Sequence, residues 1–229
     1  EISLGLVGSE MCIRDRASGL IPQITGIFGT CGGGMAMIPA LTDFTLMEEK
    51  KAKLFVNSPN AIEGNEISKC DTSTAAYQAK EAGLVDFKGS EEDVLAQIRA
   101  LVTMLPANNE DDMSYEECTD DLNRICADIA NASEDTAIAL AQIADNQILV
   151  ETKKDYAKEM VTGFIRLNGM TVGVVANRSK VYNAEAEVEA EFDSVLTVDG
   201  CKKATDFVNF CDAFSIPVLT LTNVTGFAA

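Results

Sequence analysis

The sequence has no histidine among its 229 residues. This absence excludes Ser-His-Asp and Cys-His catalysis, histidine metal ligands, and the side chain best suited to proton transfer near neutral pH. Any chemistry in this protein must therefore depend on carboxylates, lysines, thiols or the backbone itself.

Positive charge is also scarce, since 18 lysines and arginines face 36 aspartates and glutamates and leave a net charge of −18. A chain this acidic repels phosphate backbones and anionic lipid surfaces. We therefore expect no nucleic-acid partner and no direct insertion into a membrane. Residues 17–42 carry no charge, but their six glycines and two prolines would break a spanning helix, so a buried strand, turn and helix explain them better.

Paired cysteines are missing as well. The seven cysteines are odd in number and include no Cys-x-x-Cys pair. This usage argues against a disulfide framework and against a zinc site. Unpaired thiols are typical of a reducing compartment, and we expect a cytoplasmic protein.

Carboxylates are concentrated in one stretch of the chain. Between positions 107 and 135 there are ten of them and a single arginine. We interpret this run as the solvated face of a connector between two domains. Metal binding by paired carboxylates is the alternative, but no EF-hand spacing is present, and we expect no metal site.

Both ends of the sequence differ from what a complete domain would have. The first sixteen residues, EISLGLVGSEMCIRDR, lack the apolar core of a signal peptide, and GSEMCIRDR is similar to translated sequencing-adapter sequence. We expect residues 1–16 to be non-native and base no functional argument on them. At the other end the chain stops in a loop directly after an apolar run, and we expect a truncation there.

In the first half, short apolar and β-branched runs alternate with turn residues and with one strongly amphipathic segment. The pattern predicts strands at 23–28, 43–47 and 53–56, and helices at 35–41, 72–82 and 91–104. Gly83 is expected to end the second helix in a left-handed conformation. Ser90 and Asp93 form a start like a capping box for the third helix, and Pro106 stops it.

In the second half, Asn168 and Gly169 lie between the apolar runs 161–167 and 170–176. Asn-Gly supplies the two residues with positive φ that a type I′ turn requires, so the pattern predicts a β-hairpin. Other patterns predict helices near 115–130, 134–144 and 201–214, and a strand at 217–221 that leads into a loop at 222–227. Ser114 and Glu117 form a capping box for the first of these helices.

A glycine-rich stretch follows the first predicted strand and opens the first predicted helix; it reads Gly-Thr-Cys-Gly-Gly-Gly-Met-Ala over residues 29–36. A Walker phosphate loop would need a Gly-Lys-Ser or Gly-Lys-Thr end, and a dinucleotide loop would need Gly-x-Gly-x-x-Gly; neither is present. Two interpretations stay open at this point. One is an oxyanion hole built from backbone N–H groups at a helix N-terminus, and the other is a tight turn that packs a helix closely on a strand.

Four blocks of the sequence resemble, in order and spacing, the biotin-dependent acyl-CoA carboxyltransferases. They read IFGTCGGGMAMIPALTDF at 27–44, VTGFIRLNG at 161–169, VGVVAN at 172–177, and CDAFSIP at 211–217 with NVTGF at 223–227. The resemblance covers roughly residues 17–229. The family includes propionyl-CoA carboxylase β subunits, the transcarboxylase core, and carboxyltransferase subunits of methylmalonyl-CoA and glutaconyl-CoA decarboxylases.

The resemblance implies an α/β fold of the ClpP/crotonase type, which is a ββα superhelix, with two tandem crotonase-type domains that are both incomplete in this chain. After the non-native segment 1–16, residues 17–106 are then the remainder of the N-terminal domain, 107–153 an acidic helical connector, and 154–229 the start of the C-terminal domain. The active site of such a protein lies between the N-half of one subunit and the C-half of another.

It also implies that the protein moves CO₂ between carboxybiotin and the α-carbon of an acyl-CoA, with biotin held on a separate carrier protein or domain. The catalytic groups are then the backbone N–H groups of Gly33 and Gly34, which form an oxyanion hole for the thioester carbonyl. The expected substrate-binding residues are Gly32, Met35, Thr225, Gly226 and Phe227. The expected partners are acyl-CoA, the biotinylated carrier, further copies in a homo-oligomer, and other carboxylase or decarboxylase subunits.

Three departures from the family pattern affect this expectation. Gly32 stands where the family commonly has alanine, Met37 stands where it has tyrosine, and the biotin-side glycine loop is expected beyond Ala229. We therefore expect this chain alone to be inactive. A crotonase-type acyl-CoA hydratase or isomerase, and a non-catalytic scaffold subunit, stay as alternative functions.

Single residues near these motifs have two interpretations each. Cys31 is either a nucleophile or, as we prefer, a small buried thiol. Lys50, Lys51 and Lys53 either meet the phosphates of CoA or, as we prefer, form a solvated surface run with Glu48 and Glu49. Arg166 matches the family pattern, and we expect it to make a structural pairing.

Overall fold

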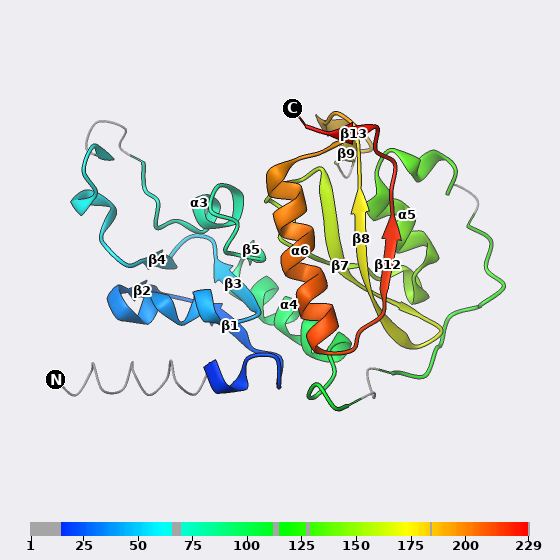
Figure 1. Cartoon of the computed structure of the whole chain (residues 1–229), viewed down its shortest axis with the longest axis horizontal. Coiled ribbons are helices and arrows are strands. Elements are labelled where there is room, and N and C mark those ends of the chain that lie inside the picture. Colours follow the sequence, from blue (N-terminus) through cyan, green and yellow to red (C-terminus); the bar gives the residue numbers. More distant parts are fainter. Residues whose placement is uncertain (1–14, 66–69, 112–114, 127–128, 184, 229) are drawn as a thin grey trace. The chain divides into compact units, whose positions relative to one another are not determined.

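A computed structural model describes residues 15–65, 70–111, 115–126, 129–183 and 185–228 (Figure 1). The chain divides into two compact units, Glu1–Val102 and Thr103–Ala229, and each is described by itself. Among the described residues, no helix combines the length and the apolar character needed to cross a bilayer.

The first unit is built on a parallel sheet with the strand order β1-β3-β5, in which β1 spans Ile24–Ile27, β3 spans Phe44–Glu48 and β5 spans Phe87–Gly89. All five residues of β3 are buried, as expected for the central strand of a parallel sheet. A separate parallel pair joins β2 (Thr30–Gly32) to β4 (Lys53–Phe55). The predicted strands at 23–28, 43–47 and 53–56 are thus confirmed within one or two residues, whereas β2 was not predicted.

Small side chains dominate the core of the first unit. It gathers buried residues from β1, β3, β4, the glycine-rich stretch and helix α3 (Ala75–Lys80), namely Ile27, Ala36, Met47, Ala52, Leu54, Ala75, Ala79 and Val85. Alanines let α3 and the glycine-rich stretch approach the strands closely. The helix predicted at 72–82 is confirmed in a shorter form, since Thr74 caps its start by accepting the Tyr77 N–H, and Gly83 has the expected positive φ of +64°.

The helix predicted at 91–104 is confirmed as α4 (Glu91–Met104). Its capping box is present, because the Asp93 N–H donates to Ser90 Oγ and the Ser90 N–H donates to a carboxylate oxygen of Asp93. The apolar face is narrower than the sequence indicates. Val94 and Leu101 are buried, whereas Leu95 and Val102 are 49% and 61% exposed.

The helix predicted at 35–41 is wrong in type. Two short 3₁₀ helices occupy this stretch, η1 (Gly33–Met37) and η2 (Pro39–Leu41). The Ile38 N–H donates to the Met35 carbonyl three residues back, and the Leu41 N–H donates to the Ile38 carbonyl. Pro39 has no N–H to continue an α-helical ladder, so the chain takes the tighter i→i+3 pattern instead. Another such turn, η3, spans Pro59–Ala61.

The second unit contains a four-stranded sheet with the order β12-β8-β7-β6. Strands β6 (Val150–Thr152), β7 (Met160–Leu167) and β8 (Met170–Asn177) pair antiparallel, and β12 (Val218–Leu221) pairs parallel to β8. Asn168 and Gly169 have φ values of +52° and +83°, which confirms the predicted hairpin. The Asp145 carboxylate accepts the N–H groups of both turn residues, at 3.0 and 2.6 Å.

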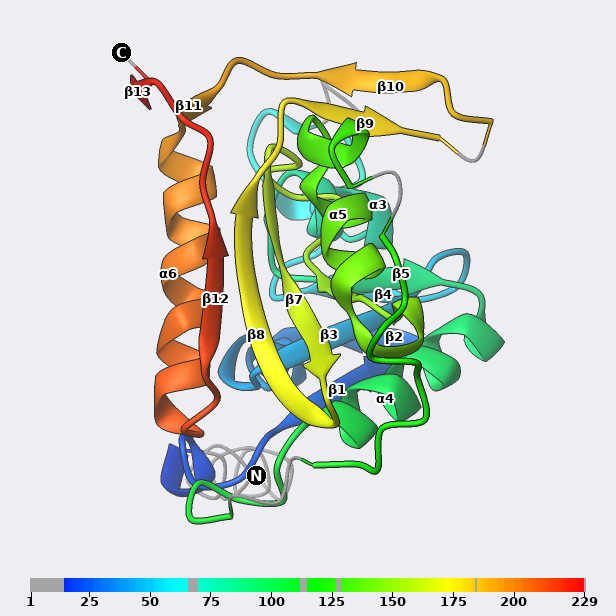
Figure 2. The same ribbon diagram turned by 90° about the vertical axis from the view of Figure 1, so that its right-hand side faces the viewer.

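Helices α5 (Thr136–Ile143) and α6 (Val198–Ala213) cover opposite faces of this sheet (Figures 1 and 2). Alternate residues of β7 and β8 meet the two helices, as the period of two in a strand requires. The α5 side holds Leu140, Ala144, Val161, Ile165, Val172, Val174 and Ala176. On the α6 side, the rings of Phe164 and Phe207 lie 5.0 Å apart. The helices predicted at 134–144 and 201–214 are confirmed, the second starting earlier because Thr197 caps it.

The helix predicted near 115–130 is wrong. Residues 115–126 and 129–130, the described part of that segment, contain turns and extended backbone but no helix, and Ser114 of its capping box lies outside the described residues. Leu122 and Ile125 are 65% and 87% exposed, so no apolar face is available to stabilise a helix so rich in carboxylates. Arg124 ties the segment to α5 by donating to the carbonyl oxygens of Gln142 and Ala144.

The segment 107–153 contributes α5, the short 3₁₀ helices η4 (Asn131–Ser133) and η5 (Asp145–Gln147), and strand β6 to the second unit. Three further short strands follow β8, namely β9 (Lys180–Tyr182), β10 (Val188–Glu191) and β11 (Val195–Leu196). The predicted loop at 222–227 contains one short strand, β13 (Gly226–Phe227), which pairs parallel to β11.

Lys203 is a charged residue in the core of the second unit, with 1% of its surface exposed. Its ammonium group donates to carbonyl oxygens of the turn between β6 and β7, those of Lys153, Tyr156, Ala157 and Met160, at 2.8, 2.8, 3.5 and 2.6 Å. Burial lowers the pKa of Lys203 to about 7. The side chain therefore fastens α6 to the turn between these two strands.

Replacing Lys203 by methionine should destabilise the protein by about 2 kcal/mol or more, because the apolar chain keeps its volume but leaves buried carbonyl oxygens without this donor. Lys202→Met is the matched control. Lys202 is exposed, so the free energy of unfolding of that variant should change by less than about 0.5 kcal/mol. Chemical denaturation followed by circular dichroism measures both, and equal effects would contradict this role for Lys203.

Gly173 on β8 has no room for a side chain, since a Cβ there would lie 2.6 Å from Cys211 Sγ on α6. Gly173→Ala should cost about 1–3 kcal/mol of stability through overpacking. In a Cys211→Ala background the sulfur is absent, and the cost should fall by about 1 kcal/mol. A double-mutant cycle of unfolding free energies measures this coupling, and strict additivity would argue against the contact.

Candidate functional site

The glycine-rich stretch, here called the glycine loop (Gly29–Ala36), contains strand β2 and most of helix η1 of the first unit. Its strand β2 pairs parallel with β4, so that Gly32 lies opposite Phe55. Helix η1 begins at the next residue, Gly33. The loop therefore has the strand-then-helix arrangement expected from the sequence, with a 3₁₀ turn in place of an α-helix.

The three consecutive glycines differ in what their missing side chains allow. A Cβ at Gly32 would lie 2.9 Å from two ring atoms of Phe55, so this glycine permits close packing of β4. Gly33 has a φ of +65°, a left-handed conformation that favours glycine, and a Cβ there would meet no atom within 4 Å. Gly34 and Met35 are exposed.

This geometry leaves room for a ligand over the start of η1. The first N–H groups of a helix have no acceptor within it, and η1 begins at Gly33, where a Cβ would meet no atom within 4 Å. Gly32, Gly33, Gly34 and Met35 are adjacent in one turn. Gly32 serves close packing, as the tight-turn interpretation expects, whereas a Cβ at Gly33 would meet no atom and Gly34 is exposed.

A cavity of about 370 Å³ adjoins the glycine loop through Phe55. It is lined by Lys53, Phe55, Ser58, Pro59, Asn60, Asn65, Cys70, Asp71 and Ser73. Lys53 Nζ lies 2.7 Å from the Asp71 carboxylate. Hydrogen bonds from Lys53 and Ser73 hold the pKa of Asp71 below its usual value. Lys53 is the one lining residue for which the sequence suggested a ligand, the phosphates of CoA. No sequence pattern indicated a binding role for the others.

The run of charges at 48–53 differs from the solvated surface that we preferred. Lys50 and Lys51 are exposed, but Glu48 is buried at the end of β3 and accepts the N–H groups of Lys51 and Ala52, at 2.5 and 3.3 Å. The Lys51 N–H is the main cause of a lowered pKa at Glu48. Glu48 therefore fixes the turn between β3 and β4. Strand β4 in turn pairs with β2 of the glycine loop.

Cys31, inside the glycine loop, packs against the core of the first unit. Burial raises the pKa of its thiol above the ordinary value. A raised pKa disfavours the thiolate, which is the nucleophilic form. The environment of Cys31 thus supports a packing role.

The other predicted site residues, Thr225, Gly226 and Phe227, lie in the second unit and follow β12. The Thr225 N–H and its hydroxyl both donate to the Ser194 carbonyl, at 2.8 and 3.0 Å. Gly226 and Phe227 form β13, and the Phe227 ring is 78% exposed. These three residues are adjacent to one another, in a different unit from the glycine loop.

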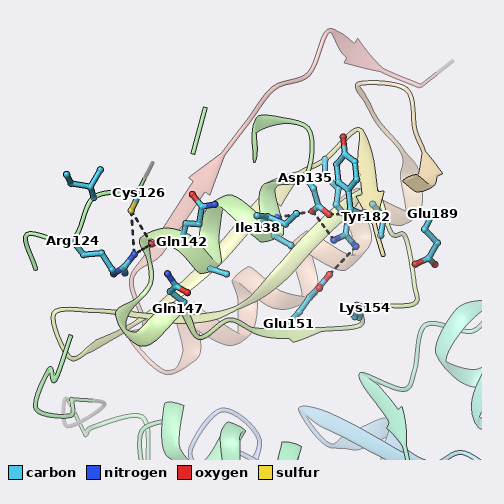
Figure 3. A pocket seen from close by; sticks show the side chains of 15 residues that line it. Arg124, Cys126, Asp135, Ile138, Gln142, Gln147, Glu151, Lys154, Tyr182 and Glu189 are labelled. Carbon is cyan, nitrogen blue, oxygen red and sulfur yellow. Dashed lines mark hydrogen bonds and ion pairs between the residues drawn. The ribbon is translucent and has the colours of Figure 1, made fainter. Parts of the chain in front are cut away.

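A cavity of about 630 Å³ in the second unit contains none of the predicted site residues (Figure 3). Arg178 is buried beside it and bridges two carboxylates, Asp135 at 3.4 Å and Glu151 at 3.2 Å. Burial raises the pKa of Glu151, and Arg178 opposes that change. The partners of Arg178 lie 43 and 27 residues away in the sequence, so no local pattern could have indicated this cluster.

Arg166 makes the structural pairing that was expected. Its guanidinium donates to the Thr103 carbonyl at 2.5 Å and forms an ion pair with Glu116. It thereby anchors the entry segment of the second unit to the hairpin.

Comparison with known proteins identifies relatives over nearly the whole chain. The family model described as the carboxyl transferase domain matches residues 4–229. The propionyl-CoA carboxylase beta chain of Cereibacter sphaeroides is 38% identical over 225 residues, which cover 92% of this chain and 42% of the relative. The methylmalonyl-CoA decarboxylase subunit alpha of Veillonella parvula is 34% identical over 223 residues, with 93% and 42% covered.

Solved structures agree with the sequence comparison. A structure of the transcarboxylase 12S hexamer with hydrolysed methylmalonyl-coenzyme A bound superposes with a TM-score of 0.84 at 30% identity, covering 99% of this chain and 44% of that one. The mixed α/β fold described above is therefore the fold of that protein over part of its length. This chain spans less than half the length of these relatives.

The resemblance carried by the four sequence blocks is thus confirmed, and the chain belongs to the carboxyl transferase domain family, of the type found in propionyl-CoA carboxylase beta chains and methylmalonyl-CoA decarboxylase alpha subunits.

Proposed function

We propose that this chain is part of an acyl-CoA carboxyltransferase that moves CO₂ between carboxybiotin and the α-carbon of an acyl-CoA. Membership of the carboxyl transferase family supports the reaction class. The observation that carries the proposal to particular atoms is the open space above Gly33, directly at the N-terminus of η1.

In this proposal, Gly33 and Gly34 donate their backbone N–H groups to the thioester carbonyl oxygen of the acyl-CoA. Two aimed donors stabilise the negative charge on that oxygen in the enolate form of the acyl-CoA. In carboxylation, the α-proton would pass to the biotin that has given up its CO₂, and the enolate carbon bonds to that CO₂. In the reverse direction, the carboxylated acyl-CoA loses CO₂ to biotin, and the resulting enolate takes the proton back. No titrating side chain is required for this, which suits a sequence without histidine. Biotin on its carrier supplies and accepts the CO₂.

The absence of side chains at Gly33 and Gly34 fits a flat, bulky thioester at this place. Gly32 acts indirectly, because its packing against Phe55 sets the path of the loop. Met35, exposed beside Gly34, contacts the acyl group in this proposal. The loop of Thr225, Gly226 and Phe227 forms a second wall, on the side that receives carboxybiotin.

The proposal also includes the finer organisation. The first unit and the second unit belong to two crotonase-type halves. Residues 107–153, expected as a connector, belong with the second half, because α5 packs in its core and β6 pairs with β7. The complete protein works as a homo-oligomer in which the N-half of one subunit and the C-half of another share an active site. The hexamer of transcarboxylase 12S, solved with hydrolysed methylmalonyl-coenzyme A, supports this assembly and an acyl-CoA substrate.

Gly34→Asp should reduce kcat for carboxyl transfer by about 10²–10³-fold in the full-length protein, because a carboxylate beside the donors repels the developing oxyanion. Gly34 is exposed, so the unfolding transition should stay close to that of the wild type. Gly29→Ala is the matched control, since a Cβ there meets no atom within 4 Å.

The assay follows transfer of the carboxyl group from methylmalonyl-CoA to biotin. Full activity in Gly34→Asp would refute catalysis by the glycine loop, whereas a wild-type protein with no carboxyl transfer at all would favour a scaffold subunit. Hydration of an enoyl-CoA by the wild type, without carboxyl transfer, would favour a crotonase-type hydratase.

A further inference from the structure

Strands β8 and β12 of the second unit run parallel and end side by side. The register pairs Ala176 with Leu221, which is the last residue of β12. One residue further along, β8 ends at Asn177, and the loop 222–227 leaves the sheet at the same edge. Carboxyl ends of adjacent parallel strands are where α/β proteins commonly place binding residues.

The Asn177 side chain bridges both backbone polar groups of Asn223. Its Oδ1 accepts the Asn223 N–H at 2.7 Å, and its Nδ2 donates to the Asn223 carbonyl at 2.7 Å. A primary amide has one acceptor and one donor side, so it matches the N–H and C=O of a single residue. The side chain therefore replaces a β-ladder partner at the point where the ladder stops.

Asn177 is itself held firmly. It is 7% exposed, and its backbone pairs with Met160 across the β7–β8 ladder. Its carbonyl oxygen accepts the hydroxyl of Thr136, at the start of α5, at 3.1 Å. Because the backbone is fixed from two sides, the amide acts as a rigid anchor, whereas Asn223 is exposed and lies in the loop beyond the end of β12.

The loop has a second anchor two residues further on, where Thr225 donates twice to the Ser194 carbonyl. Only Val224 separates the two anchors. The backbone of this loop is thus fixed at its entry by Asn177, at Thr225 by Ser194, and at Gly226 and Phe227 by the pairing of β13 with β11. Loss of the first anchor would leave the exposed Asn223 to water and free the entry of the loop, residues 222–224, at the end of β12.

We propose that Asn177 is a positioning residue, which holds the loop 222–227 in place for the carboxybiotin side of the reaction. This inference rests on the proposed function of that loop. Asn177 does not touch the reacting atoms and acts through the backbone of Asn223. Its effect should therefore concern binding on the biotin side, and the acyl-CoA side should be unaffected.

A structural test uses a fluorescent reporter in the loop. The sequence has no tryptophan, so Val224→Trp gives a single signal from the residue between the two anchors. Asn177→Ala in this background should lower the steady-state anisotropy of the introduced indole and speed proteolysis at 222–227. Asn183→Ala is the matched control, because the Asn183 side chain accepts the N–H groups of Glu185 and Glu187 in another loop of the same unit.

Asn177→Asp distinguishes loss of the hydrogen bonds to Asn223 from a general loss of packing. It keeps the shape and the acceptor for the Asn223 N–H, but it places a carboxylate oxygen against the Asn223 carbonyl. The anisotropy of the reporter indole should fall in this variant too, while the far-UV circular dichroism stays that of the wild type. Unchanged anisotropy in both variants would overturn the proposal.

A kinetic test separates the two substrates in the full-length protein with the native Val224. Asn177→Ala and Asn177→Asp should raise the KM for free biotin about tenfold, the effect expected from losing one or two neutral hydrogen bonds. The KM for methylmalonyl-CoA should change less than about twofold, and Asn183→Ala should change neither. Equal rises in both KM values, or a fall in kcat alone, would overturn the positioning role.

Failure of the proposed function would look different. A wild-type protein without carboxyl transfer would remove the substrate role of the loop, and with it this inference. The anisotropy of the reporter indole would then still show whether Asn177 orders the loop.

Discussion

The β7–β8 hairpin has to bury both of its faces, and the second unit is arranged to satisfy that requirement. Its two strands are buried at almost every position, so one helix is not enough. Helix α5 covers one face and α6 the other (Figure 2). Polar side chains hold the two ends of the hairpin, with Asp145 at the turn and Asn177 at the opposite end. The candidate loop 222–227 begins at the same end as Asn177.

Local patterns predicted the elements whose stability is local. The Asn168–Gly169 turn, the capped helix α4 and the apolar strands follow from period, caps and turn residues, and each is present. The expected helix at 35–41 is a pair of 3₁₀ turns, because Pro39 interrupts the donor ladder. A capping-box pattern and residues suited to a helix predicted the helix near 115–130. This segment has no surface to pack on, and propensity alone does not stabilise a helix of that length.

The candidate site, too, was predictable from the sequence only where its residues are adjacent in the chain. The glycine loop was visible in the sequence because its residues are adjacent, and the family blocks gave it a chemical meaning that the local pattern left open. Its surroundings were not visible. Lys53 meets Asp71 across 18 residues, and Asn177 meets Asn223 across 46. Such pairs arise only when the fold brings distant segments together, and no spacing rule connects them beforehand.

The 3₁₀ form of η1 has a consequence for the proposed function. In a 3₁₀ helix, positions three residues apart lie on the same side, so Met37 and Gly34 share one side of η1. Ala36 is buried and fixed by the core, whereas Met37 is 41% exposed. The side of η1 that Gly34 leaves without a side chain is thus bordered by one solvent-facing residue. Under the proposed function, a change in the size of Met37 would alter the space for an acyl chain while the buried Ala36 keeps its place in the core.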